Sequence, residues 1–60
     1  MRYSKDKYAF KISKLKTGER MVSVLDKQES VAAFKVVDYE SARSLIIELG
    51  GLDAVWYVTE

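Results

Sequence analysis

The segment from residue 38 to residue 51, DYESARSLIIELGG, has the pattern of one complete amphipathic helix. Its apolar residues recur at intervals of three and four, at Ala42, Leu45, Ile46 and Leu49. Asp38 stands where an N-cap is expected, since its carboxylate can accept hydrogen bonds from the free amides of the first turn. Gly50 is expected to end the helix in the left-handed conformation. The pattern therefore predicts one helix of about 11 residues, roughly 16 Å long.

Three segments with strand patterns precede this helix, and a fourth follows it. In residues 8–15, YAFKISKL, large apolar side chains occupy every second position, which is typical of a half-buried strand. Residues 20–26, RMVSVLD, alternate in the same way. Residues 31–37, VAAFKVV, are compatible with either helix or strand, but a helix there would leave Asp38 with nothing to cap. Residues 54–59, AVWYVT, favour a strand because they are β-branched and aromatic.

The predicted order of elements is β-β-β-α-β, which places the chain in the α+β class. We expect one small domain over residues 1–60, with a four-stranded, mostly antiparallel sheet and one helix packed on one face. Residues 1–6 precede the first strand and are open to fraying or disorder. A single helix of this length is wide enough to cover one face only, so the other face is expected to meet water or a partner.

The composition argues against catalysis and against metal or cofactor binding. The 60 residues include no His and no Cys, which removes the commonest zinc ligands, the usual general base and the thiol nucleophile. The acidic residues show no EF-hand or paired-carboxylate spacing, and no phosphate-loop motif is present. We therefore expect a non-enzymatic protein with no catalytic residue, no cofactor, no metal and no small-molecule substrate.

The chain offers no segment that would insert into a membrane. It has neither a run of about 18 apolar residues nor the apolar core of a signal peptide, so we expect a cytoplasmic protein without membrane contact. A chain this short buries only about 60% of the surface that its unfolded form exposes, so its core is marginal. Pairing with a second copy as a homodimer would relieve this shortage.

The face predicted to lie opposite the helix combines lysines with apolar groups. Strand alternation places there Lys7, Lys11, Ser13, Met21, Ser23, Leu25, Lys35 and Val37, together with either Trp56 or Tyr57. Contiguous apolar patches often mark contact sites, although single exposed hydrophobes are normal on any surface. Ile47 lies beside the helical stripe and is a further candidate contact. The predicted partner-binding residues are Met21, Leu25, Lys35, Val37, Ile47, Trp56 and Tyr57.

These features predict a non-enzymatic module that docks on a partner protein or on a second copy of itself. In size and pattern, the run from Asp38 to Thr59 resembles the compact accessory proteins that phages and mobile elements encode. The resemblance implies a small inhibitor or regulator that acts by docking. It covers no diagnostic motif and carries no functional residues over to this chain.

The alternative is binding of single-stranded DNA or RNA through a basic N-terminal hairpin. Residues 1–27 hold eight cations against three anions, a net +5, whereas residues 28–60 hold two cations against six anions, a net −4. Cations neutralise phosphates and aromatic rings stack on bases. The overall charge of +1 falls short of a strongly basic protein. The residues predicted to contact nucleic acid are Lys5, Lys7, Lys11, Lys14 and Arg20.

Overall fold

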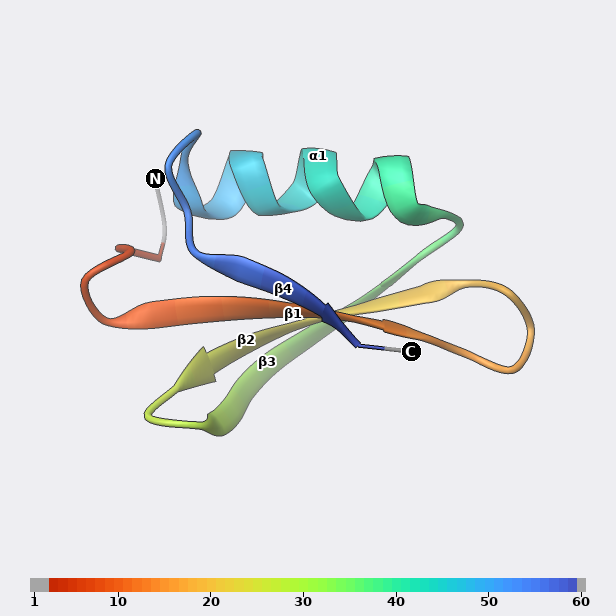
Figure 1. Ribbon diagram of the computed structural model, residues 1–60, viewed down its shortest axis with the longest axis horizontal. Helices are drawn as coiled ribbons and strands as arrows, with labels where there is room; N and C mark the ends of the chain where they lie inside the picture. Colours follow the sequence, from red (N-terminus) through yellow and green to blue (C-terminus); the bar gives the residue numbers. More distant parts are fainter. Residues whose placement is uncertain (1–2, 60) are drawn as a thin grey trace.

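The computed structural model describes residues 3–59 and has the predicted α+β architecture (Figure 1). Its elements are β1 (Tyr8–Lys14), β2 (Arg20–Asp26), β3 (Glu29–Val36), α1 (Tyr39–Gly50) and β4 (Trp56–Thr59). The order β-β-β-α-β is therefore confirmed, and the strand ends differ from the predicted ones by at most two residues. Residues 1 and 2, part of the segment predicted to be open to fraying, lie outside the described residues.

The four strands form one mixed sheet in the order β3-β2-β1-β4. β1 pairs antiparallel with β2, and β2 pairs antiparallel with β3. β4 pairs with β1 in parallel, because α1 carries the chain from one edge of the sheet to the other. β3 and β4 are therefore the two edges of the sheet.

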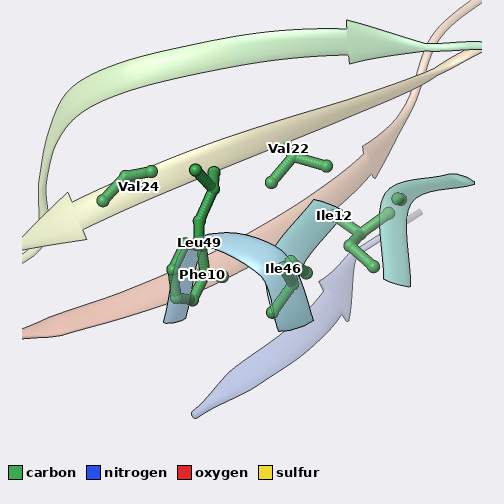
Figure 2. Close-up of a cluster of buried hydrophobic side chains, with 7 residues drawn as sticks. Phe10, Ile12, Val22, Val24, Ile46 and Leu49 are labelled. Carbon is green, nitrogen blue, oxygen red and sulfur yellow. The ribbon is translucent and has the colours of Figure 1, made fainter. Parts of the chain in front are cut away.

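The hydrophobic core lies between α1 and one face of the sheet (Figure 2). Cross-strand register sets Phe10 opposite Val24 and Ile12 opposite Val22, so these four side chains share one face. All four are fully buried, and the helix contributes Ala42, Ile46 and Leu49. Because burying one large apolar side chain stabilises the fold by about 1.5–3 kcal/mol, this layer is the main source of stability.

The ends of α1 confirm one sequence prediction and correct another. The Asp38 carboxylate accepts a hydrogen bond from the Ser41 amide at 2.8 Å, so Asp38 is the N-cap as predicted. Gly50, however, is the last helical residue, and the left-handed conformation falls on Gly51, with φ 91°. Gly50 is needed for a different reason. A Cβ there would lie 2.6 Å from Cε2 of Phe10, so the phenyl ring takes the space of a side chain.

Candidate functional site

The sheet face opposite α1, which we call the open face, is a candidate binding surface. Since Phe10, Ile12, Val22 and Val24 point toward α1, their neighbours along each strand point away from it. The side chains on the open face are Ala9, Lys11, Ser13, Met21, Ser23, Leu25, Ala33, Lys35, Tyr57 and Thr59. Within the described residues, no helix or strand covers this face (Figure 1).

The centre of the open face combines small side chains on β3 and β2 with larger ones on β1 and β4. Ala33, Ser23 and Lys11 occupy successive positions across β3, β2 and β1, and Lys11 is in turn in register with Tyr57 on β4. At the end of the strands the hydroxyl groups of Ser13 and Thr59 lie 3.2 Å apart and form a hydrogen bond. Lys11 and Lys35 are the charged residues of this face, and the Glu19 carboxylate lies 4.0 Å from Nζ of Lys35 at its edge. The face therefore keeps a positive charge and favours an anionic partner surface.

Tyr57 is the large exposed apolar group on the open face. The sequence left open whether Trp56 or Tyr57 faces outward. Trp56 is in register with Phe10 and points toward α1, where its ring centroid lies 6.1 Å from that of Tyr39. Tyr57 therefore points away from the core, and 48% of its surface is exposed. Trp56 packs against the core and does not contribute to the open face.

The other predicted contact residues are only partly brought together. Met21, Leu25 and Lys35 all lie on the open face, but the two apolar side chains are half-buried. Val37 is exposed in the link between β3 and α1. Ile47 is exposed on α1, on the other side of the sheet, and cannot contact the same partner surface. The open face thus exposes less apolar surface than the alternation predicted.

A hollow of about 330 Å³ lies at one end of the open face, and we call it the basic hollow. Its volume is at the lower end of the range for ligand pockets, and it is shallow. The N-terminal segment, the β2–β3 turn and the start of β4 meet there. Its lining residues are Lys5, Asp6, Lys7, Tyr8, Ala9, Leu25, Lys27, Gln28, Val55 and Tyr57. Three lysines against one aspartate give this lining a positive charge.

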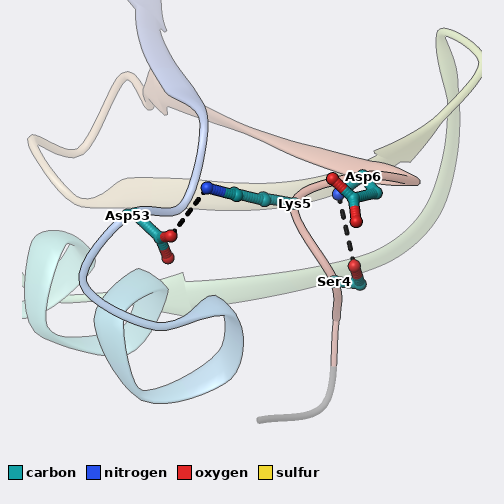
Figure 3. A network of polar contacts seen from close by, with 4 residues as sticks. All are labelled: Ser4, Lys5, Asp6 and Asp53. Carbon is teal, nitrogen blue, oxygen red and sulfur yellow. Dashed lines mark hydrogen bonds and ion pairs between the residues drawn. The ribbon is translucent and has the colours of Figure 1, made fainter.

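An ion pair holds the N-terminal wall of the basic hollow. Nζ of Lys5 lies 2.8 Å from Oδ2 of Asp53, which joins the start of the chain to the loop before β4 (Figure 3). The hydrogen bond between these two groups raises the pKa of Lys5 and lowers the pKa of Asp53. Both side chains are well exposed, so the pair contributes little to stability and acts mainly to position the loop.

The remaining lysines of this region have longer ion-pair distances or no ion pair. Nζ of Lys7 lies 4.0 Å from Oδ2 of Asp26 and 5.3 Å from the centre of the Tyr8 ring. Within residues 3–59, neither Lys11 nor Lys27 forms an ion pair within 4.0 Å. These two ammonium groups are therefore free to meet an anionic ligand.

The turn between β2 and β3 is strained, and it forms part of the wall of the basic hollow. Lys27 and Gln28 have φ angles of 54° and 71°, a conformation that usually needs glycine or asparagine. For other residues the left-handed conformation costs roughly 1–2 kcal/mol each. Residues 27–30, KQES, form a polar break of hairpin length in the sequence, but they lack the Asn-Gly or Asp-Gly pair that signals a turn with these φ angles.

The five residues predicted to contact nucleic acid do not form one surface. Lys5 and Lys7 line the basic hollow, and Lys11 lies on the open face. Lys14 and Arg20 are in register two positions beyond Ile12 and Val22, so they lie at the far end of the opposite face. A cationic surface is instead formed by Lys7, Lys11, Lys27 and Lys35. Of these, Lys27 and Lys35 were not among the residues predicted to contact nucleic acid.

Comparison with protein-family models, with curated proteins and with solved structures finds no match to this chain. Among the described residues, no three side chains of His, Cys, Asp or Glu are grouped closely enough to hold a metal ion. Within the same part of the chain, no helix has the length and apolar character needed to cross a bilayer. The candidate function therefore depends on the geometry of the open face and the basic hollow.

Proposed function

We propose that this protein is a non-enzymatic binding module that docks through its open face on a partner protein. The observation that supports this most is the uncovered sheet face itself, with Tyr57 48% exposed between Lys11 and the basic hollow. An aromatic side chain with one apolar body and one polar tip is a common anchor in protein interfaces.

The chemistry of the open face indicates the kind of surface it would contact. The small side chains of Ala33 and Ser23 allow close approach of a partner, and Lys11 and Lys35 favour acidic groups around an apolar contact for Tyr57. Lysines at the rim would mainly speed association, whereas the buried aromatic would supply most of the affinity. A small rigid body that binds without reacting suits an inhibitor or regulator of its partner.

Capture of partners from cells that produce the protein tests this proposal. Tyr57→Ala removes the anchor and Lys35→Glu reverses a charge, and each should weaken capture of the same partner at least tenfold. The matched control is Ile47→Ala, which removes an exposed apolar side chain from α1 and should leave capture unchanged. Equal capture by all three variants would rule out the open face as the docking surface.

Binding of single-stranded nucleic acid is a second candidate, and the outward direction of Tyr57 favours it. A base could stack on the Tyr57 ring while Lys7, Lys11, Lys27 and Lys35 contact phosphates. With four such contacts, raising the salt from about 50 to 200 mM should weaken binding roughly 50-fold. Fluorescence anisotropy of a labelled oligonucleotide measures this slope. Absence of binding at the lower salt concentration would eliminate the candidate.

A further inference from the structure

The two edges of the sheet are protected to different degrees. An exposed strand edge is a template for pairing with another chain, and proteins usually block it with charges or bulges. The β3 edge carries Glu29 and Lys35, and its register with β2 is interrupted by one extra residue, Val31. The β4 edge is Trp56–Thr59 and contains no charged residue, so none of these protections is present within the strand.

Exposed apolar side chains are concentrated in β4 and in the loop that leads to it. Seven large hydrophobic side chains are exposed in the described part of the chain, and four of them lie between Leu52 and Val58. These four are Leu52 at 89%, Val55 at 53%, Tyr57 at 48% and Val58 at 42%. Such clustering is typical of a contact surface.

The backbone of β4 has free hydrogen-bonding groups on its outer side. The Phe10 amide donates to the carbonyl oxygen of Val55 at 2.9 Å, so the polar groups of Val55 point toward β1. The amide and carbonyl groups of successive residues point to alternate sides of a strand. Trp56 and Val58 therefore direct theirs outward, away from the sheet. A second strand can bind there without displacing any bond within the protein.

We propose that β4 pairs antiparallel with β4 of a second copy of this chain, about a twofold axis at Tyr57. In this register Trp56 lies opposite Val58 of the second copy, and the two outward-facing residues of each strand form about four hydrogen bonds in total. The two Tyr57 rings meet on the open side, and the two sheets become one sheet of twice the width.

A second copy fits this edge better than a charged foreign strand. Self-pairing of Trp56–Thr59 brings no like charges together, and it creates the aromatic and β-branched cross-strand pairs that stabilise sheets. The paired strands are short, so the contact is smaller than the roughly 1,200–2,000 Å² of a stable interface. The dimer is therefore reversible and requires high micromolar concentration. It would place two open faces side by side, but it does not depend on the docking function proposed above.

Sedimentation equilibrium between about 10 µM and 1 mM tests the pairing. The average mass should rise from the monomer value of 6.9 kDa toward twice that value. Val58→Pro removes an outward amide that makes no bond within the protein, and an edge strand tolerates proline there, so association should weaken at least tenfold. The matched control is Val58→Thr, which keeps the amide and the branched side chain and should still dimerise.

A disulfide test gives a second readout that does not depend on proline. Because the chain has no Cys, Tyr57→Cys places a single thiol on the twofold axis, where the paired Cα atoms would lie about 4.5 Å apart. Oxidation should link this variant into dimers much faster than Val31→Cys on the β3 edge. A monomer at every concentration, or a dimer insensitive to Val58→Pro, would overturn the proposal. If the protein is monomeric and Val58→Pro abolishes binding of a different protein, the β4 edge binds that protein and the proposed self-pairing is wrong.

Discussion

The two faces of the sheet come from the same strands but have opposite compositions. On the face toward α1, β1 and β2 present Phe10, Ile12, Val22 and Val24, all fully buried. On the open face the intervening positions carry small residues, lysines and the outward-facing Tyr57. One face therefore supplies most of the stability, while the other is free to carry binding. Substitutions on the two faces should separate these properties.

The same contrast extends to charge. The basic hollow at the end of the open face is lined by three lysines. A second hollow, of about 410 Å³, lies between α1 and the end of β3, and its charged lining residues are Glu40 and Glu48. The two hollows thus carry opposite charges. An anionic partner would be attracted to the basic hollow and repelled from the hollow beside α1.

The largest expected effect on stability is at the sheet face that α1 covers, which we call the covered face. Phe10→Ala should lower the free energy of unfolding by about 3–5 kcal/mol, since it leaves a cavity beneath α1. A 60-residue domain has only roughly 3–9 kcal/mol to lose, so much of the protein should unfold. Leu25→Ala, on the open face, should cost less than about 2 kcal/mol because Leu25 is half-buried. Urea denaturation compares the two, and equal losses would contradict the division between the faces.

A smaller effect is expected where α1 meets the covered face most closely. Gly50→Ala places a Cβ 2.6 Å from the Phe10 ring, and such overpacking should cost about 1–3 kcal/mol. Ser44→Ala, on the exposed side of α1, removes a hydroxyl without crowding and should be neutral or slightly stabilising. Thermal unfolding of both variants measures the difference. An unchanged midpoint for Gly50→Ala would show that the ring is not held against the helix.

Relief of strain in the β2–β3 turn should stabilise the protein. Gln28→Gly replaces a residue with φ 71° by one that adopts this conformation freely, and we expect a gain of about 0.5–1 kcal/mol. The same change at Ser44 within α1 should instead destabilise the protein, because glycine is a poor helix former. Urea denaturation provides the comparison. A Gln28→Gly variant that loses stability would mean that the Gln28 side chain contributes more to the free energy of unfolding than the backbone strain takes away.

The smallest effect expected is at the start of α1. The hydrogen bond from the Ser41 amide lowers the pKa of Asp38 below its ordinary value of 3.8. The folded state thus favours the ionised carboxylate, so its contribution to stability is present above this value and is lost as the pH falls through the lower folded pKa. Thermal midpoints between pH 2 and 6 should show this loss, and Asp38→Asn should remove the part due to this group.

The first two strands and the helix could be predicted because their core residues recur at regular intervals, every second position in β1 and β2 and every three or four positions in α1. Val22 and Val24 face the core as predicted, and Asp38 caps the helix. The directions of Trp56 and Tyr57 could not be predicted, because Trp56, Tyr57 and Val58 are three successive large apolar residues with no alternation. The position of β4 at an edge of the sheet could not be predicted either, since strand order depends on where the chain returns to the sheet after α1 and not on local sequence.

The basic hollow could not be predicted because it depends on contacts between distant segments. Lys5 and Asp53 are 48 positions apart and meet only in the folded sheet. Lys27 and Gln28 adopt left-handed conformations in spite of their residue types, because the antiparallel register from Asp26 to Glu29 leaves two residues for the turn. The position of Lys14 opposite Arg20, on the sheet face that α1 covers, likewise follows from strand register and not from local sequence.

Site-specific photo-crosslinking tests the open face most directly. A photoreactive residue introduced at Ala33, on the exposed open face, should form covalent products with a partner in cells that produce the protein. The same residue at Ser44, on the outer side of α1, should form none, and Tyr57→Ala should abolish the Ala33 products while leaving the fold intact. Products that arise equally from Ser44, or that survive Tyr57→Ala, would contradict an open face that binds.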